Sequence, residues 1–176
     1  MDPHVEALFT APEDSAPMVR YDRVECVEGG IEGDRYLLGT GYYSPFDVCE
    51  VTFVAAEAVD EIREAFDLDL TDGRHRRNVV LRGVGTDELH DLLGAKFRIG
   101  GATFRGTRPR PPCAHVEQVA GEKGVARALK ERRGGICVDV LDAGPLSVGD
   151  ELDLLEPDAR GMGERIVDRL RGDGGE

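Results

Sequence analysis

The sequence has no apolar run of about 18 residues, the length that a membrane-spanning helix requires. Its first residues, Met1–Glu6, contain neither the basic stretch nor the apolar segment of a secretory signal. No internal repeat or low-complexity segment is present. We therefore expect a cytoplasmic protein that does not associate with membranes.

Positive charge is scarce, because 35 acidic residues outnumber 22 basic ones and the net charge is -13. This balance argues against general nucleic-acid binding, which requires a cationic face. The basic residues nevertheless gather in three places, a distribution that suggests an anion site. The three clusters are Arg74-His75-Arg76-Arg77, Arg105/Arg108/Arg110 and Lys130/Arg132/Arg133.

Paired cysteines are also absent: none of the four cysteines forms a C-x-x-C motif, which argues against a structural zinc site. Cys26, Cys49 and Cys137 stand among valines or isoleucine, a setting typical of buried apolar thiols. In a cytoplasmic protein we expect all four thiols to be reduced. Cys113 differs from the others because it lies in a proline-rich stretch with cations beside it.

That stretch, Thr107–Glu117, has three prolines in four residues, which predicts a stiff and irregular connector. Arg108 and Arg110 precede Cys113, and His115 follows it. Cations lower the pKa of a nearby thiol and favour the reactive thiolate. Cys113 is therefore the candidate nucleophile, although a small buried thiol is an equally common role for a free cysteine.

Short apolar runs between glycines and prolines predict about seven strands and two or three helices. The expected helices are Ala56–Phe66, one or two turns after an N-cap at Asp87, and Gly124–Arg132. The expected strands are Val5–Phe9, Arg20–Val27, Val48–Val54, Asn78–Arg82, a hairpin of Lys96–Ile99 with Ala102–Arg105, Ile136–Leu141 and Glu151–Leu155.

Without β-α-β alternation, this order favours a mainly β fold, a barrel with two or three short helices over its ends. We expect one domain over residues 1–157, with its core at about 20–155. Residues 158–176 are expected to form a polar, flexible tail.

Six short motifs, in one order, resemble those of the MOSC domain family, named for the C-terminal domain of molybdenum cofactor sulfurases. They are Gly30–Arg35, Arg76–Val80 with Arg82-Gly83, Leu93–Gly100, Pro112-Cys113, Arg133–Cys137 and Ser147–Asp150. No single motif is specific, but the ordered set is, and it covers about residues 20–155. The resemblance implies a MOSC-type β-barrel.

The resemblance also implies a function, a sulfur carrier that holds a persulfide on Cys113 for the assembly of metal–sulfur centres. Alternatives are a molybdenum-cofactor-dependent reductase of N-hydroxylated compounds, with Cys113 as the molybdenum ligand, or a non-catalytic cofactor-binding module. An enzyme of this kind is sulfurtransferase-like or a molybdenum-dependent oxidoreductase. The chain has no identifiable pyridoxal phosphate lysine, so a separate cysteine desulfurase or electron donor is expected as the partner.

For molybdopterin, whose phosphate suits guanidinium groups and backbone amides, the resemblance points to seven cofactor-binding candidates. These are Arg35, Arg76, Arg77, Asn78, Arg133, Gly134 and Gly135.

Several roles remain open at the level of sequence. Arg35 either contacts a ligand or forms a salt bridge with Asp34, and Asn78 either contacts a ligand or satisfies backbone groups. Arg76 and Arg77 are adjacent on an expected strand, so at most one faces a given pocket.

Two histidines are predicted to have structural roles. We expect His75 to be a solvated surface residue and His115 to be a hydrogen-bonded partner. The chain also departs from the family pattern at two positions. Arg110 replaces the first thiol of a C-x-x-C motif, and Tyr36 replaces a histidine.

Overall fold

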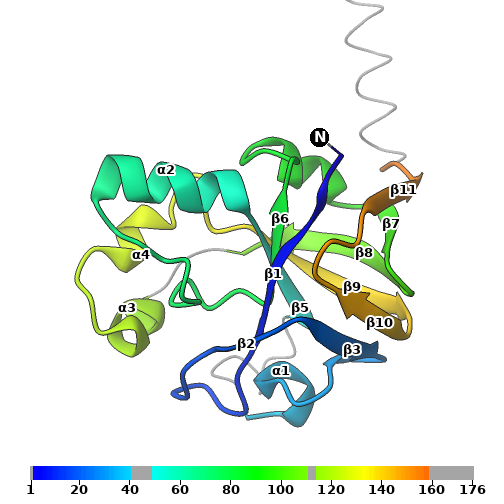
Figure 1. The fold of residues 1–176 in the computed structure, drawn as a ribbon, viewed down its shortest axis with the longest axis horizontal. Coiled ribbons are helices and arrows are strands. Elements are labelled where there is room, and N and C mark those ends of the chain that lie inside the picture. Colours follow the sequence, from blue (N-terminus) through cyan, green and yellow to red (C-terminus); the bar gives the residue numbers. More distant parts are fainter. Residues whose placement is uncertain (1, 41–48, 111–113, 159–176) are drawn as a thin grey trace, which may run out of the picture.

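The computed structural model describes residues 2–40, 49–110 and 114–158, and these residues form a mainly β fold (Figure 1). The strands are β1 His4–Thr10, β2 Val19–Tyr21, β3 Arg23–Val27, β4 Gly30–Ile31, β5 Val51–Ala55, β6 Val79–Arg82, β7 Lys96–Ile99, β8 Ala102–Pro109, β9 Ile136–Asp142, β10 Gly144–Ser147 and β11 Leu152–Glu156. The helices are α1 Arg35–Leu38, α2 Ala56–Phe66, the 3₁₀ helix η2 Glu88–Leu92, α3 Ala114–Ala120 and α4 Val125–Ala128.

Eight strands form one sheet in the order β11-β7-β8-β9-β5-β6-β1-β2, and β10, β3 and β4 form a second, smaller sheet. The large sheet curls so that its two ends meet. At that contact Val5 donates to the carbonyl of Asp150 at 2.9 Å, and Leu152 donates to the carbonyl of Pro3 at 2.8 Å. The helices α2, α3 and α4 gather on one side of the molecule (Figure 1). The mainly β fold class is thereby confirmed.

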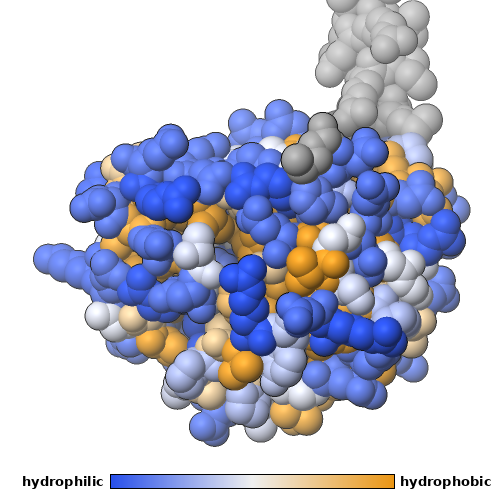
Figure 2. All heavy atoms as spheres, in the orientation of Figure 1, coloured by the Kyte–Doolittle hydropathy of each residue, from blue (hydrophilic) through white to orange (hydrophobic). Residues whose placement is uncertain are grey.

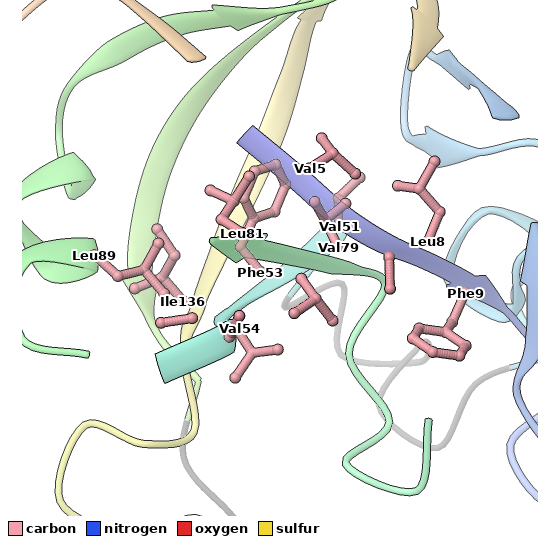
Figure 3. Close-up of a cluster of buried hydrophobic side chains, with 14 of the residues drawn as sticks. Val5, Leu8, Phe9, Val51, Phe53, Val54, Val79, Leu81, Leu89 and Ile136 are labelled. Atoms are coloured by element: carbon pink, nitrogen blue, oxygen red, sulfur yellow. The ribbon is translucent and has the colours of Figure 1, made fainter. Parts of the chain in front are cut away.

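The core is made by side chains from facing parts of the curled sheet and from α2. Phe53 of β5 packs edge-on against Phe97 of β7 and Phe104 of β8, with ring centroids 5.8 and 5.4 Å away. Figure 3 shows part of the same core, where Val5 and Leu8 of β1 approach residues of β5 and β6. β1 therefore belongs to the core, which begins before residue 20.

Helix α2 has the predicted bounds, and the apolar face that its spacing indicated is the buried one. Val59 and Ile62 of that face are 5% and 0% exposed. The β7–β8 hairpin is also confirmed, with Ile99 opposite Ala102 across Gly100-Gly101. A Cβ on Gly101 would lie 2.6 Å from the Pro145 ring, so β10 packs too close for any other residue.

Two expectations about local structure are wrong. The run Arg20–Val27 is not one strand, because its halves pair with different sheets, β2 with β1 and β3 with β10. The helix expected over Gly124–Arg132 is only Val125–Ala128, because Glu131 and Arg132 adopt left-handed backbone angles (φ 57° and 73°). Asp87 occupies the N-cap of η2 as predicted, although its side chain makes no capping hydrogen bond.

A β-α-β unit is present, although the sequence did not indicate one. β5 leads through α2 to β6, and the two strands pair in parallel, with Phe53 opposite Val79. Among the residues described, no helix has the length and apolar character needed to cross a bilayer.

Candidate functional site

Strand β8 precedes the candidate nucleophile in the sequence, and its pairing with β9 ends just before the described segment stops at Arg110. The ladder runs to Pro109 opposite Ile136, and the Arg110 amide then donates to the Gly135 carbonyl at 2.9 Å. Cys113, predicted as the catalytic residue and as a molybdenum ligand, lies outside the described residues, so both roles stay predictions. The structure does show the position of Arg110, three residues earlier in the chain.

A hollow of about 420 Å³ opens beside this end of β8. The lining residues are His90, Asp91, Leu93, Pro109, Arg110, Leu129, Glu131, Arg132, Gly134 and Gly135. Two guanidinium groups and two carboxylates thus share one concave surface. Burial, and next the charge of Arg132, lower the pKa of His90 below its ordinary value. The hollow therefore holds a largely neutral imidazole beside its cations.

The two glycines of this hollow are required by close packing. A Cβ on Gly135, whose φ is 83°, would clash with the Phe53 carbonyl on the neighbouring strand. A Cβ on Gly134 would lie 2.8 Å from the Leu129 carbonyl and 3.3 Å from the Arg77 guanidinium. The glycine pair thus lets the turn before β9 close tightly against β5 and Arg77.

Arg110 is held by the tyrosine that departs from the family pattern. Its Nη2 donates to the Tyr36 hydroxyl at 2.9 Å, and its guanidinium lies 6.0 Å from the Tyr36 ring centroid. The Arg35 guanidinium lies 4.5 Å from the same ring. The two departures from the family pattern are thus in contact with each other.

Arg35 takes part in a buried salt bridge, one of the two roles left open by the sequence. Its Nη1 lies 3.1 Å from Asp34 Oδ1, and the side chains are 4% and 0% exposed. Asp34 also accepts from the Ala11 and Tyr36 amides, while Arg35 Nη2 donates to the Arg76 carbonyl at 3.0 Å. This network ties the start of α1 to the segments after β1 and before β6.

Arg76 and Arg77 extend in different directions. Arg76 donates to the carbonyls of Ala16 and, at 2.7 Å, Asp14. Burial and the charge of Arg35 lower the Arg76 pKa to about 10. Arg77 donates to the Gly134 carbonyl at 2.8 Å, so only Arg77 reaches a residue that lines the hollow.

Asn78 bridges three strands. Its Oδ1 accepts from the Thr52 amide and hydroxyl, both at 3.0 Å, and its Nδ2 donates to the Phe9 carbonyl at 3.1 Å. Both Asn78 and Thr52 are fully buried. The side chain therefore satisfies backbone groups of β1 and β5.

Arg133 packs back onto helices and is not among the lining residues of the hollow. Its Nε donates to the Ala128 carbonyl at 2.6 Å, and its guanidinium lies 5.0 Å from the Phe66 ring centroid. Its neighbour Arg132 lines the hollow instead. The basic cluster thus contributes Arg132 to the hollow, and the left-handed turn decides which guanidinium faces which way.

Comparison with known protein families identifies the family of this chain. The MOSC domain family profile matches residues 46–153, which is more than half of the chain.

The chain belongs to the MOSC domain family.

Solved structures support the fold of this MOSC protein. The YuaD protein from Bacillus subtilis is 20% identical, with a TM-score of 0.73 over 89% of this chain and 97% of that one. YiiM from Geobacillus stearothermophilus is 17% identical, with a TM-score of 0.68 over 88% of this chain and 75% of that one. YiiM from Escherichia coli is 18% identical, with a TM-score of 0.61 over 87% and 70%. No curated protein matches the sequence.

The MOSC family is associated with the molybdenum cofactor, and the hollow offers groups that fit one end of it. The guanidinium groups of Arg110 and Arg132 suit a phosphate. The carboxylates of Asp91 and Glu131 line the same hollow and repel a phosphate that comes close to them. No group of three or more His, Cys, Asp or Glu side chains in the described segments could hold a metal ion.

Two expectations about reactive side chains in the MOSC domain are wrong. Cys49 and Cys137 form a disulfide with their Cα atoms 5.6 Å apart, so not all four thiols are reduced. The pairing of Thr52 with Cys137 brings the start of β5 to β9 and makes this bond possible. His75 is 1% exposed, not a solvated surface residue, because the chain before β6 turns it under the Phe9 ring.

Cys26 is the buried, apolar thiol that the sequence indicated. Cys26 in β3 is buried, and desolvation raises its pKa to about 12, which makes it a poor nucleophile. His115 in α3 lies 3.5 Å from the Asp14 carboxylate.

Proposed function

We propose that this MOSC protein is a sulfur carrier that holds a sulfur atom as a persulfide on Cys113 and delivers it for metal–sulfur centre assembly. The observation that carries the proposal is the position of β8. It brings the chain, at Arg110, to the rim of a hollow lined by Arg110, Arg132 and two glycines. Cys113 follows three residues later.

The chemistry of transfer needs no external oxidant. The Cys113 thiolate attacks the terminal sulfur of a donor persulfide, the donor S–S bond breaks, and the donor leaves as a thiolate. A nucleophilic acceptor then attacks the terminal sulfur on Cys113, which leaves as a thiolate again. Cations near the sulfur favour both the attacking thiolate and the persulfide anion.

The donor in this proposal is a separate cysteine desulfurase in the cytoplasm, because no pyridoxal phosphate lysine is identifiable in this chain. Arg110 has a defined position in the site, since the Tyr36 hydroxyl and ring hold its guanidinium. A positioned cation acts more effectively on a developing charge than a mobile one.

A second candidate is a molybdenum-cofactor-dependent reductase of N-hydroxylated compounds that receives electrons from another protein. The observation favouring it is the size of the hollow, about 420 Å³, which lies in the range of small-molecule sites. Arg110 and Arg132 would hold the cofactor's phosphate, and the bound cofactor would supply the redox chemistry. A third, non-catalytic role in cofactor binding would use the same residues.

Intact-mass spectrometry after incubation with a cysteine desulfurase and cysteine tests the carrier function. The protein should gain one sulfur atom that alkylation traps on Cys113, and the Cys113→Ser variant should gain none. The matched control Cys26→Ser removes a buried thiol and should load normally. The Arg110→Gln variant should load several-fold more slowly, since it removes a cation that lowers thiol pKa.

Sulfur found first on Cys26, or equal loading of the Cys113→Ser variant, would contradict the carrier proposal. Stoichiometric molybdenum in the purified protein, lost with Cys113→Ser, would favour the reductase instead.

A further inference from the structure

A second cavity lies between α2 and the strands β1 and β6, with a volume of about 360 Å³. Its lining residues are Glu6, Ala7, Phe9, Arg20, Ala56, Val59, Asp60, Arg63, Thr71, His75, Val80 and Arg82. None of them lines the hollow beside Arg110. Figure 2 shows apolar surface recessed below α2 and framed by hydrophilic side chains. Neither the carrier nor the reductase proposal uses this cavity.

The buried polar group of the cavity is His75, which is 1% exposed. Its Nδ1 accepts from the Arg77 amide at 2.9 Å. Burial, followed by the charges of Arg77 and Arg76, lowers its pKa to about 3, so the ring is neutral at pH 7. A neutral ring that accepts at Nδ1 carries its proton on Nε2. Within the described part of the chain, the hydrogen bond found for this ring is the one at Nδ1, which leaves Nε2–H to donate to a ligand.

The charges around the cavity leave one cation without a carboxylate. Arg82 bonds to Glu6 at 2.9 Å and to Asp60 at 2.6 Å, and Arg63 lies 3.4 Å from Asp60. For Arg20, no ion pair is found among the described residues. Its guanidinium instead lies over the Phe9 ring, 5.8 Å from the centroid.

Phe9 joins the two polar groups into one site. The His75 ring meets its edge, with centroids 5.5 Å apart and planes at 82°, while Arg20 lies over its face. The Arg20 guanidinium and the His75 ring are therefore within about 11 Å of each other. The surface between them is apolar and comes from α2, β1 and β6.

We propose that this cavity binds a small aromatic carboxylic acid that carries a second oxygen at its far end. The carboxylate pairs with Arg20, the aromatic body lies against Phe9 and Val59, and His75 Nε2–H donates to the second oxygen. The cavity volume is at the lower end of the range for ligand sites, which suits a ligand with one ring. Apolar walls with a few placed polar groups are typical of such sites.

The test uses 4-hydroxyphenylacetate as the probe, with binding followed by calorimetry and by NMR of the imidazole nitrogens. The probe should bind at millimolar concentration or tighter and shift the His75 Nε2–H resonance. Arg20→Gln should weaken binding about tenfold, because it removes the charge-assisted pair. Arg23→Gln changes an exposed arginine of β3, in the smaller sheet, that pairs with Glu25, and it should leave binding unchanged.

Two analogues separate the contacts. 4-Hydroxybenzyl alcohol lacks the charge, and 4-methylphenylacetate lacks the second oxygen, so each should bind about tenfold more weakly than the probe. Equal binding of all three compounds, equal binding by Arg20→Gln, or no shift of the His75 resonance would overturn the proposal. Cys113→Ser should bind the probe as the parent does, so failure of the carrier function would not mimic failure here.

Discussion

Replacing Asn78 with alanine tests whether this residue acts in the fold. The side chain makes three hydrogen bonds at 3.0 to 3.1 Å, to the Thr52 amide, the Thr52 hydroxyl and the Phe9 carbonyl. Because Asn78 and Thr52 are both 0% exposed, water does not replace these bonds without opening the sheet. The variant should therefore lose stability even when no ligand is present.

The magnitude follows from the groups that lose this partner. The Thr52 amide and the Phe9 carbonyl are both backbone groups inside the sheet, and each such loss costs about 1–3 kcal/mol. Asn78→Ala should lower the free energy of unfolding by about 3 kcal/mol, a large share of the roughly 5–15 kcal/mol typical of a domain. Asn78→Asp should cost more, because it buries a carboxylate against the Phe9 carbonyl.

Urea unfolding, followed by circular dichroism, measures the effect as a shift of the midpoint at constant slope. Thr71→Ala is the matched control, because it removes an exposed hydroxyl that donates to Asp69 at 2.6 Å. It should change stability by less than about 0.5 kcal/mol. A double-mutant cycle with Thr52→Val should give a coupling energy of about 1 kcal/mol.

An Asn78→Ala variant that unfolds at the parent midpoint would refute this reasoning. If the same variant kept its stability but lost molybdenum-cofactor binding, Asn78 would be a ligand-contacting residue, as the family resemblance implied.

Two further predictions concern the region around the start of β5. Burial and a hydrogen bond with Asp139 raise the Glu50 pKa to about 7 from its ordinary 4.5, so folding favours the protonated form. Its contribution to stability is present below about pH 4.5 and is lost as pH rises to 7. Glu50→Gln should remove this dependence of the unfolding free energy on pH, measured by urea titrations at several pH values, and should be the more stable form at about pH 8. An unchanged pH dependence would contradict the raised Glu50 pKa. The Cys49–Cys137 disulfide closes a separation of 88 residues, so Cys49→Ser should lower the unfolding free energy by about 4 kcal/mol. Alkylation without reductant in denaturant should label only Cys26 and Cys113, and labelling of all four cysteines would show the bond to be absent.

The local sequence pattern was enough to predict those elements whose structure depends on one stretch of the chain. The spacing of Val59 and Ile62 in α2 and the Gly100-Gly101 turn were identified from sequence, because helix period and turn residues are local properties. The ordered motifs also led to the MOSC family, and the family profile confirms it.

Features that depend on which strands become neighbours were not available from sequence. The run Arg20–Val27 is one pattern but two strands, because its halves find partners in different sheets: Arg20 pairs with Phe9, 11 residues away, and Val24 pairs with Leu146, 122 residues away. The disulfide and the burial of His75 have the same origin, since long-range pairing decides what meets a cysteine or an imidazole.

The sequence by itself determined that this chain is a mainly β member of the MOSC family, with a cation-flanked cysteine after a proline-rich stretch. Only the tertiary structure decided the use of its arginines. Arg35, Arg76 and Arg77 hold backbone carbonyls, while Arg110 and Arg132 line the hollow beside β8. The physical reason is that a guanidinium group can donate either to a backbone carbonyl or to an anion, so its role depends on which acceptor the fold brings within about 3 Å.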